Sequence, residues 1–286
     1  MKRLIQVYKG VDQWGTIGPP GFGDFIRGIC HLYEMLENHP DVKLYVDFSQ
    51  SEFGKYISSN SDILSVGNQQ KIIDAPTYFV DHPALRERLK SFIDSDEKEL
   101  YLSTNIGDWN RTLLPNSVKE FARQFYKFDP TVEQEVTSAI GAEEYAVLSI
   151  RCGDHFFQPG QDHHLSEIPP KISDIIENFV LQQCSLPILV TSDHYELKIL
   201  LAKKYGFLLL NHKSEHGAYG NVLPVIKDLC ALKNSSKNFY INAWTTWWSG
   251  FSHYTSIIFD IPSLNFRHPE YIPEYISRDG TLTTTI

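Results

Sequence analysis

The stretch 145–157 reads Y-A-V-L-S-I-R-C-G-D-H-F-F. Its apolar first part predicts a buried strand over 145–151, and this strand delivers Arg151, Asp154 and His155 to its carboxyl end. Ligands bind at that edge in open α/β sheets. Arginine suits a phosphate because its planar fork donates two parallel hydrogen bonds. The stretch therefore indicates a ligand-binding strand end, and a plain salt bridge between Arg151 and Asp154 is the alternative.

The bulk composition is that of a globular protein with room for two compact domains, since the chain has 286 residues and is 42% hydrophobic. Its 26 basic and 35 acidic residues give a net charge of −9, which argues against a nucleic-acid partner. The four cysteines form no C-x-x-C pair that would indicate zinc. No apolar run is long enough for a signal peptide or a membrane span. We expect a soluble, cytoplasmic protein.

Alternating strand and helix patterns predict an α/β fold. A strand at 4–8, a glycine-rich loop at 10–23, a helix at 25–37 capped by Asp24 and a strand at 42–48 make one β-α-β unit. Further elements expected before residue 130 are strands at 71–74, 78–80 and 99–104 and helices at 84–93 and 117–126. Because a helix at 131–140 leads into a new series of elements, we place a boundary near Asp129 and Pro130. The expected domains are 1–130 and 131–286.

The second domain alternates more regularly and predicts a parallel sheet with helices on both faces. The expected strands are 145–151, 187–191, 207–210 and 238–242, and the expected helices are 171–183, 194–205, 222–233 and 250–259. Thr191, Ser192 and Asp193 stand at the second of these strand ends. Ser192 or Asp193 is expected to cap the next helix, and the group can also contact a base or ribose.

The last expected helix begins in a sequence suited to a phosphate. Ser249, Gly250, Phe251, Ser252 and His253 stand where backbone N–H groups and the helix dipole favour an anion. The tryptophans just upstream are either core aromatics or a flat platform for a base or sugar ring. They are Trp244, Trp247 and Trp248.

The glycine-rich loop near the amino terminus offers another possible ligand contact. Gly21 and Gly23 would let a substrate approach the backbone, and Asp24 and Arg27 lie one helical turn apart. The loop lacks the phosphate-loop pattern. A tight connection with a capping Asp24 is the alternative.

Four short motifs together resemble the fucosyltransferase superfamily. The segment 149–154 resembles its H-x-R-R-x-D motif, 191–193 its T-x-D motif, 249–252 its S-x-F-S-like motif, and 21–28 its G-x-G-[ND]-x-x-R-G loop. The resemblance implies a GT-B-like glycosyltransferase, with two Rossmann-like domains facing across a cleft. It also implies an inverting reaction that needs no metal or other cofactor, with a nucleotide sugar as co-substrate and a glycan or glycoconjugate acceptor.

The resemblance also implies roles for particular residues. Arg151 would contact the β-phosphate, Asp193 with Thr191 and Ser192 would hold the nucleoside, and the segment 249–252 with His253 would cradle the diphosphate. Gly21, Gly23 and Arg27 complete the expected donor-binding set.

Two departures from the motif concern the donor. Ser149 stands where the family often has histidine, and Cys152 where it often has a second arginine. One positive charge of the motif is therefore missing, which leaves a diphosphate donor expected but not its sugar. GDP-fucose is one candidate, and UDP-xylose or an activated rhamnose is the alternative.

Inversion needs a base that deprotonates the acceptor hydroxyl on the face opposite the leaving group. Asp24 is the first candidate for this catalytic role, and Asp154 and His155 are the others.

Rival interpretations rest on other residues. Asp94-Ser95-Asp96 is a D-x-D sequence of the kind that holds a cation in GT-A transferases, but its charged surroundings favour a solvated turn. His155, Asp162, His163 and His164 match no ligand pattern, so no metal is expected.

A noncatalytic glycan-binding protein that uses its tryptophans is a further alternative. A sugar-nucleotide epimerase would require a dinucleotide loop that the sequence lacks.

Overall fold

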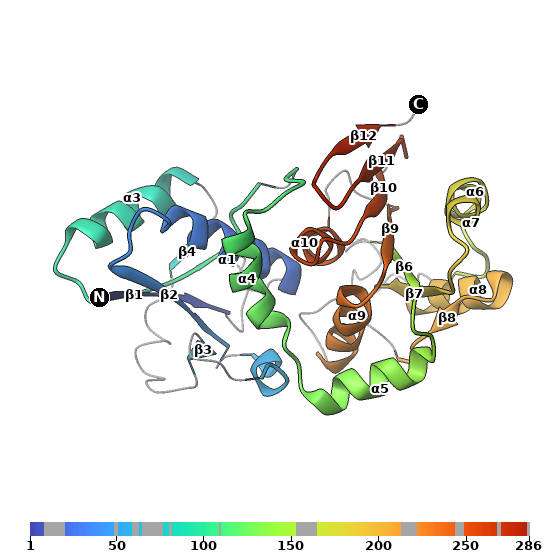
Figure 1. The fold of residues 1–286 in the computed structure, drawn as a ribbon, viewed down its shortest axis with the longest axis horizontal. Coiled ribbons are helices and arrows are strands. Elements are labelled where there is room, and N and C mark those ends of the chain that lie inside the picture. Colours follow the sequence, from blue (N-terminus) through green and yellow to red (C-terminus); the bar gives the residue numbers. More distant parts are fainter. Residues whose placement is uncertain are drawn as a thin grey trace. The chain divides into compact units, whose positions relative to one another are not determined.

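The computed structural model describes residues 1–8, 21–48, 51–58, 63–64, 77–79, 82–108, 110–152, 165–212, 222–243, 249–267 and 270–284. The chain forms two compact units (Figure 1). Unit 1 comprises Met1–Asp108, Pro115–Lys127 and Gly217–Val222, and unit 2 comprises Trp109–Leu114, Phe128–His216 and Leu223–Ile286.

Unit 1 is built on a five-stranded parallel sheet in the order β3-β2-β1-β5-β4. The strands are β1 (Lys2–Val7), β2 (Val42–Asp47), β3 (Ile63–Leu64), β4 (Thr77–Phe79) and β5 (Glu99–Thr104). The helices are α1 (Phe22–Met35), α3 (His82–Asp94), α4 (Asn116–Arg123) and the short 3₁₀ turns η1 (Glu52–Lys55) and η2 (Gln124–Tyr126). The expected strand at 71–74 lies outside the described residues.

Unit 2 is built on a seven-stranded sheet in the order β12-β11-β10-β9-β6-β7-β8. Its strands are β6 (Ala146–Arg151), β7 (Ile188–Ser192), β8 (Leu208–Leu209), β9 (Lys237–Asn242), β10 (Ser263–Arg267), β11 (Pro273–Ile276) and β12 (Leu282–Thr284). Its helices are α5 (Pro130–Ile140), α6 (Pro170–Ile175), the π-helical η4 (Ile176–Val180), α7 (Leu181–Gln183), α8 (Tyr195–Tyr205), α9 (Leu223–Lys233) and α10 (Gly250–Ile258). Strands β6 to β10 are parallel to one another, and β11 and β12 add an antiparallel edge beside β10.

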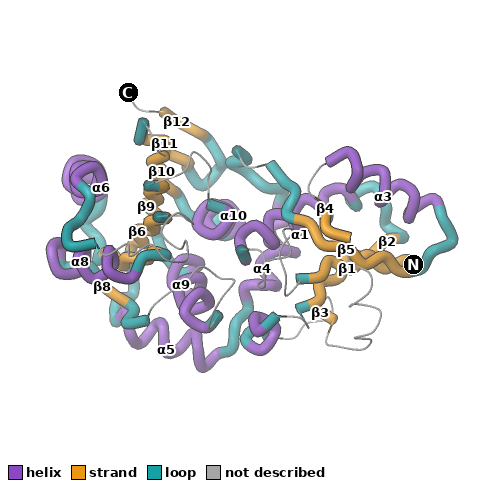
Figure 2. The backbone as a smooth tube through the Cα atoms, turned by 180° about the vertical axis from the view of Figure 1, so that it is seen from behind, coloured by secondary structure: helices purple, strands orange, loops and turns teal. Residues whose placement is uncertain are grey.

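Helices cover both faces of the sheet in unit 2. Figure 2 shows α6 and α8 on one side of the strands and α9 and α10 on the other. This is the doubly wound arrangement that strand–helix alternation predicts, because right-handed crossovers return each strand parallel to the last. The expected α/β class with parallel sheets is confirmed.

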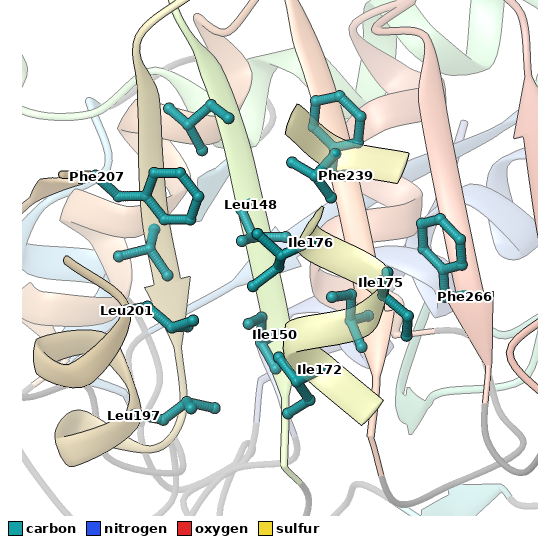
Figure 3. Packing of buried hydrophobic residues seen from close by; sticks show 14 of the residues in the cluster. Leu148, Ile150, Ile172, Ile175, Ile176, Leu197, Leu201, Phe207, Phe239 and Phe266 are labelled. Carbon is teal, nitrogen blue, oxygen red and sulfur yellow. The ribbon is translucent and has the colours of Figure 1, made fainter. Parts of the chain in front are cut away.

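The two faces of this sheet differ in chemistry. One is apolar and packs against α6, η4 and α8 (Figure 3). Its core includes Leu148, Ile150, Phe239 and Phe266, and each such buried side chain stabilises the fold by roughly 1.5–3 kcal/mol. Because strand side chains alternate between faces, the residues between these face α9 and α10. They are largely polar and yet buried: Ser149, Thr191, Asn238, Tyr240, Asn242, Ser263 and Asn265.

Some local expectations are wrong. Helix α1 begins earlier than expected, with Gly21 at its N-cap, so Asp24 lies inside the first turn and does not cap the helix. Helix α8 is capped by the His194 side chain, whose Nδ1 accepts from Leu197 N at 3.3 Å, instead of by Ser192 or Asp193. The single helix expected at 171–183 is split by the π-helical turn η4.

Candidate functional site

The sheet of unit 2 changes its winding direction between β6 and β9. From β6 the chain adds β7 and β8 on one side, and then crosses to add β9 and β10 on the other. Ligands bind beyond the carboxyl ends of strands at such a switch point. Arg151 and Asn242 are paired across β6 and β9 there, and Asn242 pairs with Arg267 across β9 and β10. The switch point therefore carries two arginines with a buried asparagine between them.

Asp193 joins the ends of β6 and β7. Its Oδ1 accepts a hydrogen bond from Cys152 N at 2.7 Å, and its Oδ2 lies 3.7 Å from Arg151 Nη1. The side chains of Arg151 and Asp193 retain 30% and 13% of their exposure, so the arginine is the more accessible partner. Asp154, the alternative partner for Arg151, lies outside the described residues. Asp193 does not cap α8, and its carboxylate instead orients the end of β6, which carries Arg151.

A buried chain of hydrogen bonds connects three of the motifs. Thr191 Oγ1 donates to Ser149 Oγ at 3.2 Å, and Ser149 Oγ donates to Asn238 Oδ1 at 3.3 Å. Asn238 Nδ2 donates to Ser256 Oγ at 3.0 Å, and Ser256 Oγ donates to Ser252 O at 2.9 Å. Each member is satisfied by the next, so the chain can fix the sheet against α10 without a desolvation penalty.

The start of α10 has the features expected of an anion site. Ser249 is its N-cap, with its Oγ accepting from Phe251 N at 3.2 Å, and Gly250 is the first helical residue. Ser249 and Ser252 are 9% and 2% exposed. The helix dipole places partial positive charge at this end.

His253 is directed to another segment of unit 2. Its Nε2 donates to the carbonyl oxygen of Arg111 at 2.6 Å, and the ring is 1% exposed. Burial lowers the pKa of His253 to about 3, an effect that the hydrogen bond to Arg111 opposes and the charge of Arg267 reinforces. A carbonyl only accepts, so the proton resides on Nε2 of a neutral ring. His253 thereby ties α10 to the segment 110–114.

Tyr240 was not among the expected site residues. It is 1% exposed on the polar face, paired with Ser149 on β6 and Asn265 on β10. Burial raises the pKa of its phenol well above the ordinary value, while the charge of Arg151 lowers it, that of Asp193 raises it, and the hydrogen-bonding groups of the Ser249 side chain and backbone lower it. Although Ser249 lies beside it, the hydroxyl makes no hydrogen bond of normal geometry among the described residues. Parts of all three carboxyl-terminal motifs therefore surround one buried phenol.

In unit 1, Asp24 and Arg27 form an ion pair near the start of α1. Arg27 Nη1 donates to Asp24 Oδ1 at 2.9 Å, and Arg27 Nε donates to the carbonyl of Asn105 at 2.8 Å. The side chain of Arg27 is fully buried, whereas that of Asp24 is 34% exposed. Arg27 thus anchors α1 to the loop after β5 and presents the carboxylate of Asp24.

Two glycines make this packing possible. A Cβ at Gly28 would lie 2.1 Å from the carbonyl oxygen of Thr104, and a Cβ at Gly107 would lie 2.4 Å from Arg27 Cγ. A Cβ does not come this close to another heavy atom, so a side chain at either position would force its neighbour to shift. The R-G pair of the amino-terminal motif therefore has a packing role. Gly21 and Gly23 flank the start of α1, and Gly23 is buried there.

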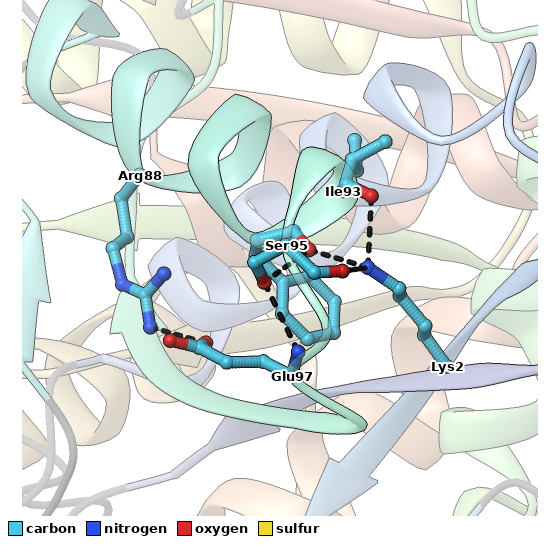
Figure 4. Close-up of polar contacts among 6 residues, drawn as sticks. Lys2, Arg88, Ile93, Ser95 and Glu97 are labelled. Carbon is cyan, nitrogen blue, oxygen red and sulfur yellow. Dashed lines mark hydrogen bonds and ion pairs between the residues drawn. The ribbon is translucent and has the colours of Figure 1, made fainter.

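The D-x-D sequence lies at the end of α3 (Figure 4). Lys2 Nζ donates to the carbonyls of Phe92, Ile93 and Ser95 at 2.7, 2.8 and 2.5 Å, which satisfies acceptors left over at the helix end. Asp94 and Asp96 are not buried. Within the described ranges, no group of His, Cys, Asp or Glu side chains could hold a metal ion.

Several expected residues cannot be placed. Asp154, His155, Asp162, His163, His164, Trp244, Trp247 and Trp248 lie outside the described residues. Their roles stay predictions.

Solved structures of fucosyltransferases share this fold over nearly the whole chain. NodZ α-1,6-fucosyltransferase co-crystallised with GDP is 12% identical, with a TM-score of 0.56 over 99% of this chain and 98% of that chain. Fucosyltransferase NodZ from Bradyrhizobium is 11% identical, with a TM-score of 0.55 over 99% and 98%. The apo form of POFUT1 is 12% identical, with a TM-score of 0.52 over 93% and 97%.

The chain therefore has the GT-B-like fold of these fucosyltransferases, and the expected fold class and fold resemblance are confirmed. No protein-family model and no curated protein sequence matches the chain. Among the helices that the structure describes, none is both long and apolar enough to cross a membrane.

Proposed function

We propose that this protein is a glycosyltransferase that moves a sugar from a nucleoside-diphosphate sugar to a glycan or glycoconjugate acceptor. The observation that carries the proposal is the convergence of Arg151, Asp193 and Ser249 around the switch point of a sheet whose fold is that of GDP-binding fucosyltransferases. A switch point alone is shared by many nucleotide-binding folds, but this residue set matches the chemistry of a diphosphate.

The donor diphosphate would bind between Arg151 and the start of α10. The guanidinium supplies a fixed charge, and the helix start adds backbone N–H groups and the positive end of a dipole. In glycosyl transfer the diphosphate gains negative charge as the bond to the sugar breaks. Donors already fixed near the phosphates stabilise that charge in the transition state. The contact of Asp193 with both Cys152 N and Arg151 would hold the guanidinium in place for this purpose.

The reaction is expected to invert the anomeric carbon. The acceptor oxygen forms a bond to that carbon, the bond to the diphosphate oxygen breaks with its electron pair, and the hydroxyl proton passes to a base. Asp24 is the proposed base, because its carboxylate is partly exposed and held by a buried arginine. Arg27 is proposed as the residue that positions Asp24, since its own buried side chain is committed to Asp24 and Asn105.

Binding of nucleoside diphosphates tests the donor site. GDP or UDP should raise the melting temperature of the wild-type protein, because a ligand that binds only the native state stabilises it. Arg151→Ala should abolish this shift, and Arg151→Lys should restore it only in part because lysine lacks the fork. Arg88→Ala is the matched control, since it removes an arginine from an exposed ion pair with Glu97 in unit 1. Absence of a shift with either nucleotide would favour a noncatalytic glycan-binding protein.

Turnover tests the reaction and the donor. A hydrolysis screen over GDP-fucose, UDP-xylose and activated rhamnose should show release of one nucleoside diphosphate, with activity that persists in EDTA. Asp24→Asn should abolish turnover and leave nucleotide affinity nearly intact. Full activity in that variant would remove Asp24 from the mechanism without affecting the assignment of the donor site.

A further inference from the structure

The hydroxyl of Tyr240 is a buried group on the polar face of the unit 2 sheet that makes no hydrogen bond of normal geometry among the described residues, and Oδ1 of Asn265 is another. Of the other hydroxyls that meet at this face, those of Ser149, Thr191 and Ser256 take part in the hydrogen-bond chain described above, and that of Ser263 accepts from Asn265 Nδ2 at 3.1 Å. Tyr240 is 1% exposed, and its hydroxyl has no partner of normal geometry among the described residues. Leaving a buried hydroxyl unpaired destabilises a protein, so such a group calls for an explanation.

Ser249 beside it has unused hydrogen-bonding capacity. A serine hydroxyl can donate once and accept twice. Ser249 Oγ accepts from Phe251 N, and within the described part of the chain this is its one hydrogen bond of normal geometry. One lone pair and the hydroxyl proton therefore remain available. Ser249 is also less deeply buried than Tyr240 and begins the helix that faces the proposed donor phosphates.

We propose that Tyr240 is a positioning residue of the donor site: when a nucleoside diphosphate binds, its hydroxyl donates to Ser249 Oγ, and Ser249 donates its own proton to a phosphate oxygen. In this arrangement Ser249 accepts from Phe251 N and from Tyr240 while it donates to the ligand, so the donor and both acceptor positions of Ser249 and the hydroxyl proton of Tyr240 are used. The inference rests on the proposed function, because it requires a diphosphate at the start of α10.

The arrangement gives a role to a buried hydroxyl that makes no hydrogen bond of normal geometry within the described part of the chain. This hydroxyl orients Ser249 once the ligand is present. Hydrogen bonds to charged groups are stronger than neutral ones, and a chain that ends on a phosphate polarises each of its members. Replacement by phenylalanine removes only the oxygen and keeps the ring packed between β6 and β10.

The test uses Tyr240→Phe with Tyr145→Phe as the matched control. Tyr145 is also a buried phenol of unit 2, but its hydroxyl donates to the carbonyl of Ala231 at 2.6 Å. Tyr240→Phe should leave the melting temperature of the free protein unchanged or higher and weaken GDP or UDP binding roughly tenfold. Tyr145→Phe should do the reverse, with a lower melting temperature and unchanged affinity.

A double-mutant cycle with Ser249→Ala separates the possible outcomes. If Tyr240 acts through Ser249, adding Tyr240→Phe to Ser249→Ala should cause no further loss of affinity. Equal affinity of Tyr240→Phe and the wild type would overturn the inference and leave the proposed function standing, as would additive losses in the double variant. If the wild type binds neither GDP nor UDP in calorimetry, the proposed function fails and the inference falls with it.

Discussion

His253 should make the stability of unit 2 depend on pH in a predictable way. Its pKa is lowered from the ordinary value of 6.5 to about 3, mainly because the ring is buried. In the unfolded chain the ring is solvated and takes up a proton near its ordinary pKa. Between these two values the unfolded state therefore binds more protons than the native state, and stability is lost as the pH falls through this window.

The magnitude follows from the two pKa values. A pH unit within the window costs about 1.4 kcal/mol. Between pH 7 and pH 5 the loss of stability due to His253 is therefore about 2 kcal/mol, because only the part of this range below pH 6.5 lies under the pKa of the unfolded chain. This is a large share of the roughly 5–15 kcal/mol that stabilises an ordinary domain.

The comparison protein is His253→Gln, because a glutamine amide can still donate to the carbonyl of Arg111 and does not titrate. Equilibrium urea unfolding followed by circular dichroism gives the free energy of unfolding of both proteins at each pH. The other histidines contribute to both proteins alike, so the difference isolates residue 253. That difference should shift by about 2 kcal/mol in favour of the variant between pH 7 and pH 5. A difference that stays constant over this range would refute the burial of a neutral His253.

Two further substitutions test the packing that positions the site. Gly28→Ala should destabilise unit 1 by about 3 kcal/mol or more, because its Cβ would lie 2.1 Å from Thr104 O. Gly206→Ala is the control, because no heavy atom lies within 4 Å of a Cβ at that position. Only the strain of the positive φ at Gly206 opposes that substitution. Thermal unfolding of both variants checks this, and equal losses would contradict the clash. Asn238→Ala should cost about 1–3 kcal/mol because it leaves the Ser149 hydroxyl without its acceptor. Adding Ser149→Ala should recover part of that loss in urea unfolding, and a purely additive result would speak against the hydrogen-bond chain.

Much of the fold follows from local patterns in the sequence. The strand expected at 99–104 has the same bounds as β5, and the helix expected at 131–140 begins one residue later than α5. These elements are bounded by signals that act locally, such as the cap Asp129 and the left-handed Gly141 of α5. Strands β10 to β12 were not expected. Their polar and apolar residues alternate only briefly. Strand β11 is formed by pairing with β10, and β12 by pairing with β11.

The candidate site was foreseen at its strand ends but not in its interior. Arg151, Asp193 and Ser249 follow apolar runs, and such abrupt changes are visible in a sequence. Tyr240 and Asn242 alternate with Phe239 and Ile241, which is the pattern of a strand with one polar face. The pattern was available, but it normally indicates solvent, and only the position of α10 over the sheet shows that these polar side chains are buried. That Asp193 is a partner of Arg151 could not be predicted from the sequence either, because it depends on which strand lies next to β6.

Ser149 and Cys152, which depart from the fucosyltransferase motif, lie on opposite faces of the sheet, and each residue fits the packing of its own face. Ser149 lies on the polar face, 4% exposed and engaged by Thr191 and Asn238, so a histidine there would have to displace this hydrogen-bond chain. Cys152 is 1% exposed and belongs to the apolar cluster, so a second arginine at this position would direct its charge away from the face that carries Arg151. The cation that does share a face with Arg151 is Arg267, which reaches the switch point from β10 and pairs with Glu274. The positive charge near the switch point is thus spread over separate strands instead of adjacent residues. A donor that binds at the proposed site would meet a different charge distribution from the one that the fucosyltransferase motif implies.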